Sequence, residues 1–180
     1  IALIGSGGTI DAAAAVTLSG ALSGSAALSV QGSGALTLSN SGNSTSFSGT
    51  TNVRDSVLKV AGDANLGSGA VTLNGGTLTL TAATTIDNAL ELVGSGGTVV
   101  ADAAAATLSG DLSGDGDLTK AGSAVLTLTG TGAYTGSTQV QAGTLQVTGV
   151  LNGTADVAVA SGATLAGTGS IGTAGASGEV

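Results

Sequence analysis

The sequence predicts an all-β protein, a parallel β-helix (solenoid) with roughly 20 residues per coil and about nine coils. Three observations predict this fold. The chain contains two copies of one long unit, its apolar residues alternate with polar ones, and Leu recurs at intervals of one coil. Each coil of a solenoid buries its apolar face only against its neighbours, so regular recurrence along the chain is the expected signature.

The internal repeat is the clearest of these observations. Gly5-Ser6-Gly7-Gly8-Thr9 recurs as Gly94-Ser95-Gly96-Gly97-Thr98, 89 residues later, and Leu36-Thr37-Leu38 recurs as Leu126-Thr127-Leu128, 90 residues later. The two copies occupy about residues 5–80 and 94–167. Because a long unit repeated at a nearly constant offset indicates a stacked architecture, we expect residues 1–180 to form a single β-helix segment.

Strands are predicted wherever apolar and polar residues alternate with a period of two. The pattern is clear in Val71-Thr72-Leu73 and in Thr77-Leu78-Thr79-Leu80-Thr81. Asn74-Gly75-Gly76 separates these two segments, because glycine supplies the positive φ that a sharp bend requires. The alanine runs at 12–15 and 103–106 are too short to nucleate a helix, so we expect strand or turn there as well.

The spacing of Leu predicts the length of one coil. Leu recurs at steps of 19 or 20 residues in two series, Leu38, Leu58, Leu78 and Leu126, Leu145, Leu165. Three short strands and three turns fit this length. Coils stacked about 4.8 Å apart would lay Leu on Leu and Thr on Thr, and about nine of them give a rod about 40 Å long.

The chain has two aromatic residues, Phe47 and Tyr134, at equivalent places in the two copies. A narrow, close-packed coil has room for Leu, Val, Ile and Ala but not for many rings. We therefore expect the two rings to pack at a corner or over a loop. The alternative is a platform on which sugars stack, with one ring in each unit.

Composition excludes several classes of partner and of chemistry. The net charge is −8 and the basic residues are Arg54, Lys59 and Lys120, so the clustered cations that bind nucleic acid are missing. No apolar run reaches the ~18 residues of a membrane-spanning helix, which argues against direct membrane insertion. His and Cys are absent, which excludes Ser-His-Asp triads, thiol nucleophiles and His or Cys metal sites. We expect no catalytic residues, no cofactor and no enzyme activity.

One acidic cluster is a candidate calcium site. Asp111, Asp115 and Asp117 are separated by small residues, and closely spaced Asp with Gly between them can wrap Ca²⁺. The corresponding segment of the first copy, Gly20 to Leu28, has no acidic residue. A solvated loop is the competing interpretation, and no other metal site is predicted.

The second copy carries a long string of motifs. Residues 107–147 contain L-S-G-x-L-S-G-x-G-x-L-T-K-x-G, then L-T-L-T-G, Y-T-G-x-T and A-G-T-L-x-V. This string resembles the passenger-associated repeat of bacterial autotransporters. Residues 86–173 match the pattern closely. Residues 5–80 match more loosely, because the segment from Asn40 to Arg54 departs from the Y-T-G stretch.

The resemblance implies a right-handed parallel β-helix passenger, exported through the periplasm and across the outer membrane by a C-terminal β-barrel of the same polypeptide. On this basis the chain is a fragment of a longer passenger and lies outside the cell or on its surface. Its implied function is that of a structural stalk that supports adhesion or cell–cell self-association. Likeness of fold does not settle what a tip domain would do.

Two other functions are compatible with the residues. Thr-x-Thr rows such as Thr77-Leu78-Thr79 would suit a β-helix that binds a ligand, either glycan or ice, although Thr144-Leu145-Gln146 breaks the row. The rod would otherwise be the scaffold for an enzymatic tip domain outside this chain.

Overall fold

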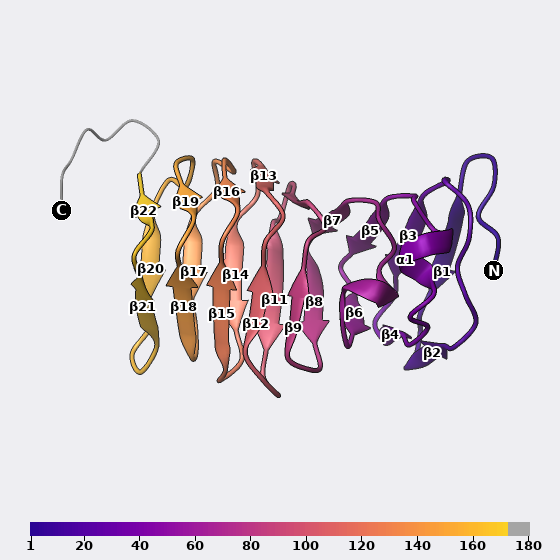
Figure 1. Ribbon diagram of the computed structural model, residues 1–180, viewed down its shortest axis with the longest axis horizontal. Coiled ribbons are helices and arrows are strands. Elements are labelled where there is room, and N and C mark those ends of the chain that lie inside the picture. The colour runs from indigo at the N-terminus through magenta and orange to yellow at the C-terminus, as the bar shows by residue number, and fades with distance from the viewer. Residues whose placement is uncertain (173–180) are drawn as a thin grey trace.

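Three sheets of short parallel strands build the molecule, and the chain visits them in turn as it winds (Figure 1). The computed structural model describes residues 1–172. Strands pair with their counterparts one coil before and one coil after, and the ladders between them are parallel. The coils therefore stack along one axis, and the predicted all-β parallel solenoid is confirmed.

Wall 1 is a nine-stranded sheet. Its strands are β1 (Gly8–Asp11), β3 (Leu28–Gln31), β5 (Thr51–Arg54), β7 (Val71–Asn74), β10 (Leu90–Leu92), β13 (Leu112–Gly114), β16 (Thr131–Gly132), β19 (Val150–Leu151) and β22 (Ser170–Ile171). Wall 2 is an eight-stranded sheet. Its strands are β2 (Val16–Leu18), β4 (Ala35–Leu38), β6 (Val57–Val60), β8 (Gly76–Leu80), β11 (Gly97–Ala101), β14 (Leu118–Ala121), β17 (Thr138–Val140) and β20 (Val157–Val159).

Wall 3 is regular only in the second half of the rod. There it is a five-stranded sheet of β9 (Thr84–Ile86), β12 (Ala106–Leu108), β15 (Val125–Leu128), β18 (Thr144–Val147) and β21 (Thr164–Gly167). In the first half its place is taken by isolated bridges at Ser23 and Phe47 and by two short helices, α1 (Asn43–Ser46) and the 3₁₀ turn η1 (Asp63–Asn65). No helix within the described residues is long and apolar enough to cross a membrane.

One turn of the solenoid takes 19 to 23 residues, as the pairs Val71–Leu90 and Leu28–Thr51 show. The nine strands of wall 1 mark about eight turns, where the sequence predicts about nine. The longest turn is the one that contains α1. The right-handed winding that the resemblance implies stays a prediction.

The Leu rows follow the predicted spacing with one exception. Leu126, Leu145 and Leu165 stack in one row. Leu58 pairs with Leu78 as predicted, but Leu36 and not Leu38 is the partner of Leu58. The prediction for Leu38 was wrong because α1 lengthens that turn.

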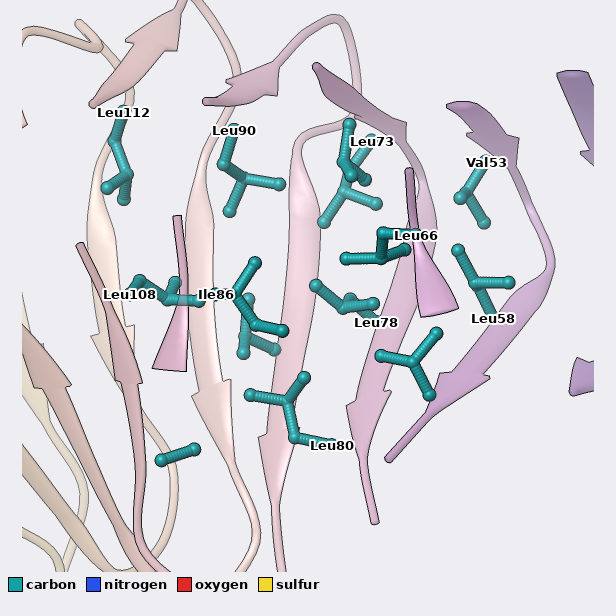
Figure 2. Packing of buried hydrophobic residues seen from close by; sticks show 14 of the residues in the cluster. Val53, Leu58, Leu66, Leu73, Leu78, Leu80, Ile86, Leu90, Leu108 and Leu112 are labelled. Carbon is teal, nitrogen blue, oxygen red and sulfur yellow. The ribbon is translucent and has the colours of Figure 1, made fainter. Parts of the chain in front are cut away.

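The interior is a continuous column of aliphatic side chains from all three walls. Figure 2 shows Leu58, Leu78, Leu90 and Leu112 pointing into the space that the walls enclose. Alternation along each strand produces this column because every second side chain points inward. Phe47 and Tyr134 also lie inside, 1% and 0% exposed, so neither ring presents a face on which a sugar could stack.

The two repeat copies occupy different walls. Leu36-Thr37-Leu38 lies in β4 of wall 2, whereas its counterpart Leu126-Thr127-Leu128 lies in β15 of wall 3. Four turns along wall 2 lead from β4 to β14, and β15 is one wall further. An outward residue carried by the repeat is therefore presented on a different side of the rod in each copy.

A column of glycines forms the corner between wall 3 and wall 1. Gly110, Gly130, Gly149 and Gly169 occupy corresponding places in successive coils. A Cβ added at Gly130 would lie 2.4 Å from the carbonyl oxygen of Gly110, and one at Gly149 would lie 2.2 Å from that of Gly130. The stacked backbones approach more closely than a side chain allows, which explains the glycine that ends L-T-L-T-G.

We predict that Gly130→Ala lowers the free energy of unfolding by about 1–3 kcal/mol, because the new methyl group must push two coils apart. Gly20→Ala is the matched control, since a Cβ at Gly20 meets no atom within 4 Å. That variant should stay within about 0.5 kcal/mol of the parent. Urea unfolding followed by circular dichroism measures both, and equal losses would contradict the close approach.

Candidate functional site

Polar side chains at the corners and in the interior connect each coil to the next, and these inter-coil contacts are the candidate functional site. The most regular of them involves five Ser and Thr residues at strand ends. Each donates its backbone N–H and its hydroxyl to one carbonyl oxygen of the preceding coil: Ser39 to Leu18, Thr81 to Val60, Ser109 to Ile86, Thr129 to Leu108 and Thr148 to Leu128. The hydroxyl residue that directly follows each of these strands thus has a structural role.

The three predicted calcium ligands act as acceptors for backbone amides. Each carboxylate accepts an N–H of a neighbouring coil: Asp111 from Thr131 at 3.0 Å, Asp117 from Ser137 at 2.7 Å and Asp115 from Gly94 at 3.2 Å. Asp111 precedes β13, whereas Asp115 and Asp117 lie in the corner between β13 and β14. Across residues 1–172, no group of three or more His, Cys, Asp or Glu side chains is placed to hold a metal ion. One oxygen of each carboxylate, Oδ1, is thus engaged by a backbone amide.

Lys120 is a charged residue inside the rod. Its side chain is 0% exposed, and Nζ donates to the carbonyl oxygens of Ala121 and Gly122 at 2.7 Å and of Ala142 at 3.0 Å. Ala142 belongs to the next coil, so the ammonium joins two successive corners. Burial lowers the pKa of Lys120, and the Asp102 carboxylate opposes that shift.

The basic residues alone do not predict this role, because a lysine is normally found at the surface. The signal lay in the alternation. Leu118-Thr119-Lys120 puts the lysine in phase with the inward Leu118. Val30 holds the equivalent place in the first copy and is also 0% exposed. One copy therefore fills this position with an ammonium group and the other with an apolar side chain.

A network of hydroxyl groups lies beside the buried Tyr134. Its phenol is hydrogen-bonded to the hydroxyl of Thr138, which in turn lies 2.9 Å from Oγ1 of Thr154 in the next coil. Thr154 Oγ1 is 3.0 Å from the carbonyl oxygens of Gly136 and Asp156. Burial raises the pKa of Tyr134, and the hydrogen bonds from Thr138 and Thr154 oppose that shift. The Y-T-G-x-T motif thereby ties one coil to the next.

Buried asparagines extend the same principle to the first half of the rod. Asn43 accepts the N–H of Leu22 from the preceding coil at 2.8 Å and donates to the carbonyl of Asn65 in the following coil at 2.7 Å. One amide group therefore joins three coils. Asn88 donates to two carbonyl oxygens of its preceding coil at 2.7 and 2.8 Å.

The outward rows of the walls are mostly polar. Wall 1 carries a row of Thr9, Ser29, Asn52, Thr72, Glu91 and Ser113. Wall 2 stacks Thr77, Thr98 and Thr119 between Val57 and Gln139. Wall 3 stacks Thr85, Thr107 and Thr127 before Gln146. Each of these Thr rows is three coils long.

Comparisons with known proteins agree with the repeat seen in the structure. The family described as passenger-associated transport repeat matches residues 28–60 and 118–147. A curated relative, the adhesin BmaC autotransporter of Brucella suis biovar 1 (strain 1330), is 36% identical over 117 residues. That match covers 63% of this chain and 3% of the relative, so the chain spans a small part of that protein's length. No solved structure matches the chain.

We predict that Lys120→Met removes a pH dependence of stability. Because burial lowers the pKa of Lys120 below the 10.5 of a solvated lysine, the unfolded chain binds this proton more tightly than the folded chain does. The free energy of unfolding of the parent should therefore rise as the pH is raised toward 10.5, and the variant should lack this rise.

Urea unfolding between about pH 8 and 9.5 measures the effect, because above that range the raised pKa of Tyr134 contributes with the opposite sign. Lys59→Met is the matched control, since Lys59 lies on the outer face of β6. It should keep the rise. A flat profile for the parent, or a Lys59 variant that loses the rise, would contradict the role given to the buried ammonium.

Proposed function

We propose that the chain is a stretch of an autotransporter passenger domain with two passenger-associated transport repeats, and that it serves as a structural stalk segment. The stalk belongs to a bacterial autotransporter that is displayed at the cell surface or secreted. The rod supports adhesion or cell–cell self-association.

The observation that carries this proposal is where the repeat motifs place their side chains. Lys120, Tyr134 and Thr138 are buried, Thr129 bonds to the preceding coil, and Gly130 stands where two backbones meet. These motif residues contribute to inter-coil contacts. A repeat whose signature maintains stacking favours a role as a spacer.

The stacking also suits a protein that crosses a membrane as an unfolded thread. Pairing partners lie 19 to 23 residues apart, so each coil can form on the coil already in place. Folding that proceeds from neighbour to neighbour outside the cell lowers the free energy coil by coil and requires no ATP there.

We further propose that residues 1–180 are one segment of a longer passenger, whose C-terminal outer-membrane β-barrel lies in the same polypeptide. The matching adhesin is far longer than this chain, which covers 3% of it. In this arrangement the barrel is the part that enters the membrane, and the rod lies outside the cell.

A non-enzymatic role is part of the proposal. The sequence has no His and no Cys, and Asp111, Asp115 and Asp117 each hold a backbone amide of a neighbouring coil with one carboxylate oxygen. Chemistry would have to come from a tip domain for which the rod is the scaffold. A ligand-binding rod is the second candidate function, favoured by the Thr rows. Rows of three Thr offer little flat surface for ice, so glycan is the better-supported ligand.

The test is to fuse the segment to a host outer-membrane barrel and follow the settling of cells by turbidity. We predict that displaying cells settle faster than cells carrying the barrel alone. Replacing Thr9, Ser29, Asn52 and Thr72 of wall 1 with Lys should slow the settling, because like charges then face each other between rods.

A matched variant carries four Lys at Thr85, Thr107, Thr127 and Gln146 of wall 3, which tests whether one face is responsible. Protease accessibility on intact cells measures display. Normal display without settling would contradict self-association and leave the spacer role. Failure of the parent segment to reach the surface with an active barrel would contradict the stalk itself.

A further inference from the structure

The corner between walls 1 and 2 is hollowed on both sides of Gly75. A single residue, Gly75, joins β7 to β8, whereas two residues, Asp55 and Ser56, form the preceding corner and the four residues 93–96 form the following one. Gly75 has a φ of 66°, and a Cβ there would lie 2.2 Å from Oδ1 of Asp55, so this position stays without a side chain.

Two hollows meet at Gly75, one of about 310 Å³ and one of about 150 Å³. We call them together the corner groove. Its lining carries one apolar side chain, Val57, and otherwise hydroxyls and carboxylates: Ser33, Asp55, Ser56, Thr77, Ser95, Thr98, Asp117 and Thr119. The groove crosses five coils, from Gly32 to Asp117, which corresponds to about 19 Å along the rod at about 4.8 Å per coil.

The lining determines which ligands fit. No Lys, Arg or aromatic side chain lines the groove, and its carboxylates repel phosphate and sulfate groups. An added peptide strand would need free backbone groups. Here Gly75 N–H donates to the Gly96 carbonyl at 2.7 Å and Thr77 N–H to the Ser56 carbonyl at 2.8 Å, so the corner backbone is already paired between coils. A sugar polymer with uncharged hydroxyl groups is not repelled by the carboxylates and needs no free backbone groups.

We propose that the corner groove binds a neutral, linear oligosaccharide that runs along the rod axis. Asp55 and the free oxygen of Asp117 accept hydrogen bonds from sugar hydroxyls, because Oδ1 of Asp117 already accepts the amide of Ser137. Thr77 and Thr98 exchange hydrogen bonds with the same sugars. Thr77, Thr98 and Thr119 stack in register, so successive sugars meet the same group at each coil.

This inference rests on the proposed function, because a rod outside the cell is the one that meets glycans of other cells. The groove is open and has no aromatic platform, so a single rod binds in the millimolar range. Many rods on one cell then give avidity well beyond the affinity of one groove.

The test is a titration of the isotope-labelled chain with cellohexaose and with maltohexaose, followed by amide chemical shifts. The amides of Gly75, Ser95 and Thr98 should move. Asp55→Asn removes a carboxylate but tolerates the positive φ of 44° at this position, and Ser95→Tyr fills the groove. Each should weaken binding about tenfold, as expected for one lost charge-assisted hydrogen bond or a blocked site.

Ser68→Tyr is the matched control, because Ser68 is an exposed serine on the corner between η1 and β7. It should leave binding unchanged. The proposal is overturned if neither sugar moves these amide shifts at about 10 mM, or if Ser68→Tyr weakens binding as much as Ser95→Tyr does. Tighter binding of a heparin hexasaccharide than of both neutral sugars would also overturn it. Surface display distinguishes failure of the groove proposal from failure of the stalk proposal. A chain that is displayed normally but binds no sugar rejects the groove and leaves the stalk.

Discussion

The parallel register between one coil and the next is the interaction on which the rest of the structure depends. It places each residue against a partner 19 to 23 positions away and so decides what every side chain meets. The Leu column, the glycine corner and the Ser and Thr contacts all follow from that register. Lys120 shows its strength, because an ammonium group is held in the apolar interior by carbonyl oxygens of two successive coils.

The fold class, the coil length and much of the core could be predicted from the sequence, because alternation and recurrence are direct consequences of stacked strands. Leu126, Leu145 and Leu165 stack as their spacing predicts. The exception at Leu38 arises from α1, a single helical turn that is too short to leave a periodic pattern in the sequence. The burial of Lys120 is also hard to predict, because its charge favours a surface position. Its phase in the strand, two residues after the inward Leu118, indicates the interior.

The inter-coil contacts were harder to predict than the fold. The sequence around Asp111 and Asp117 gives no sign that each carboxylate accepts a backbone amide, because the donor lies one coil away in the chain. The corner groove depends on the same information, because its lining residues come from five successive coils. The two repeat copies lie one wall apart. Equivalent outward residues of the two copies therefore do not align on one side of the rod.

Deletion of one whole coil tests the central claim most directly. Removing residues 90–111 would bring Leu112 into the place of Leu90, against Val71, and keep every wall in phase. Removing residues 101–111 would delete a wall-3 strand and put the following coils out of phase. If neighbour register controls the structure, the first variant unfolds cooperatively in urea with the circular dichroism of β-sheet, and the second loses this transition. Equal damage in the two variants would contradict the account.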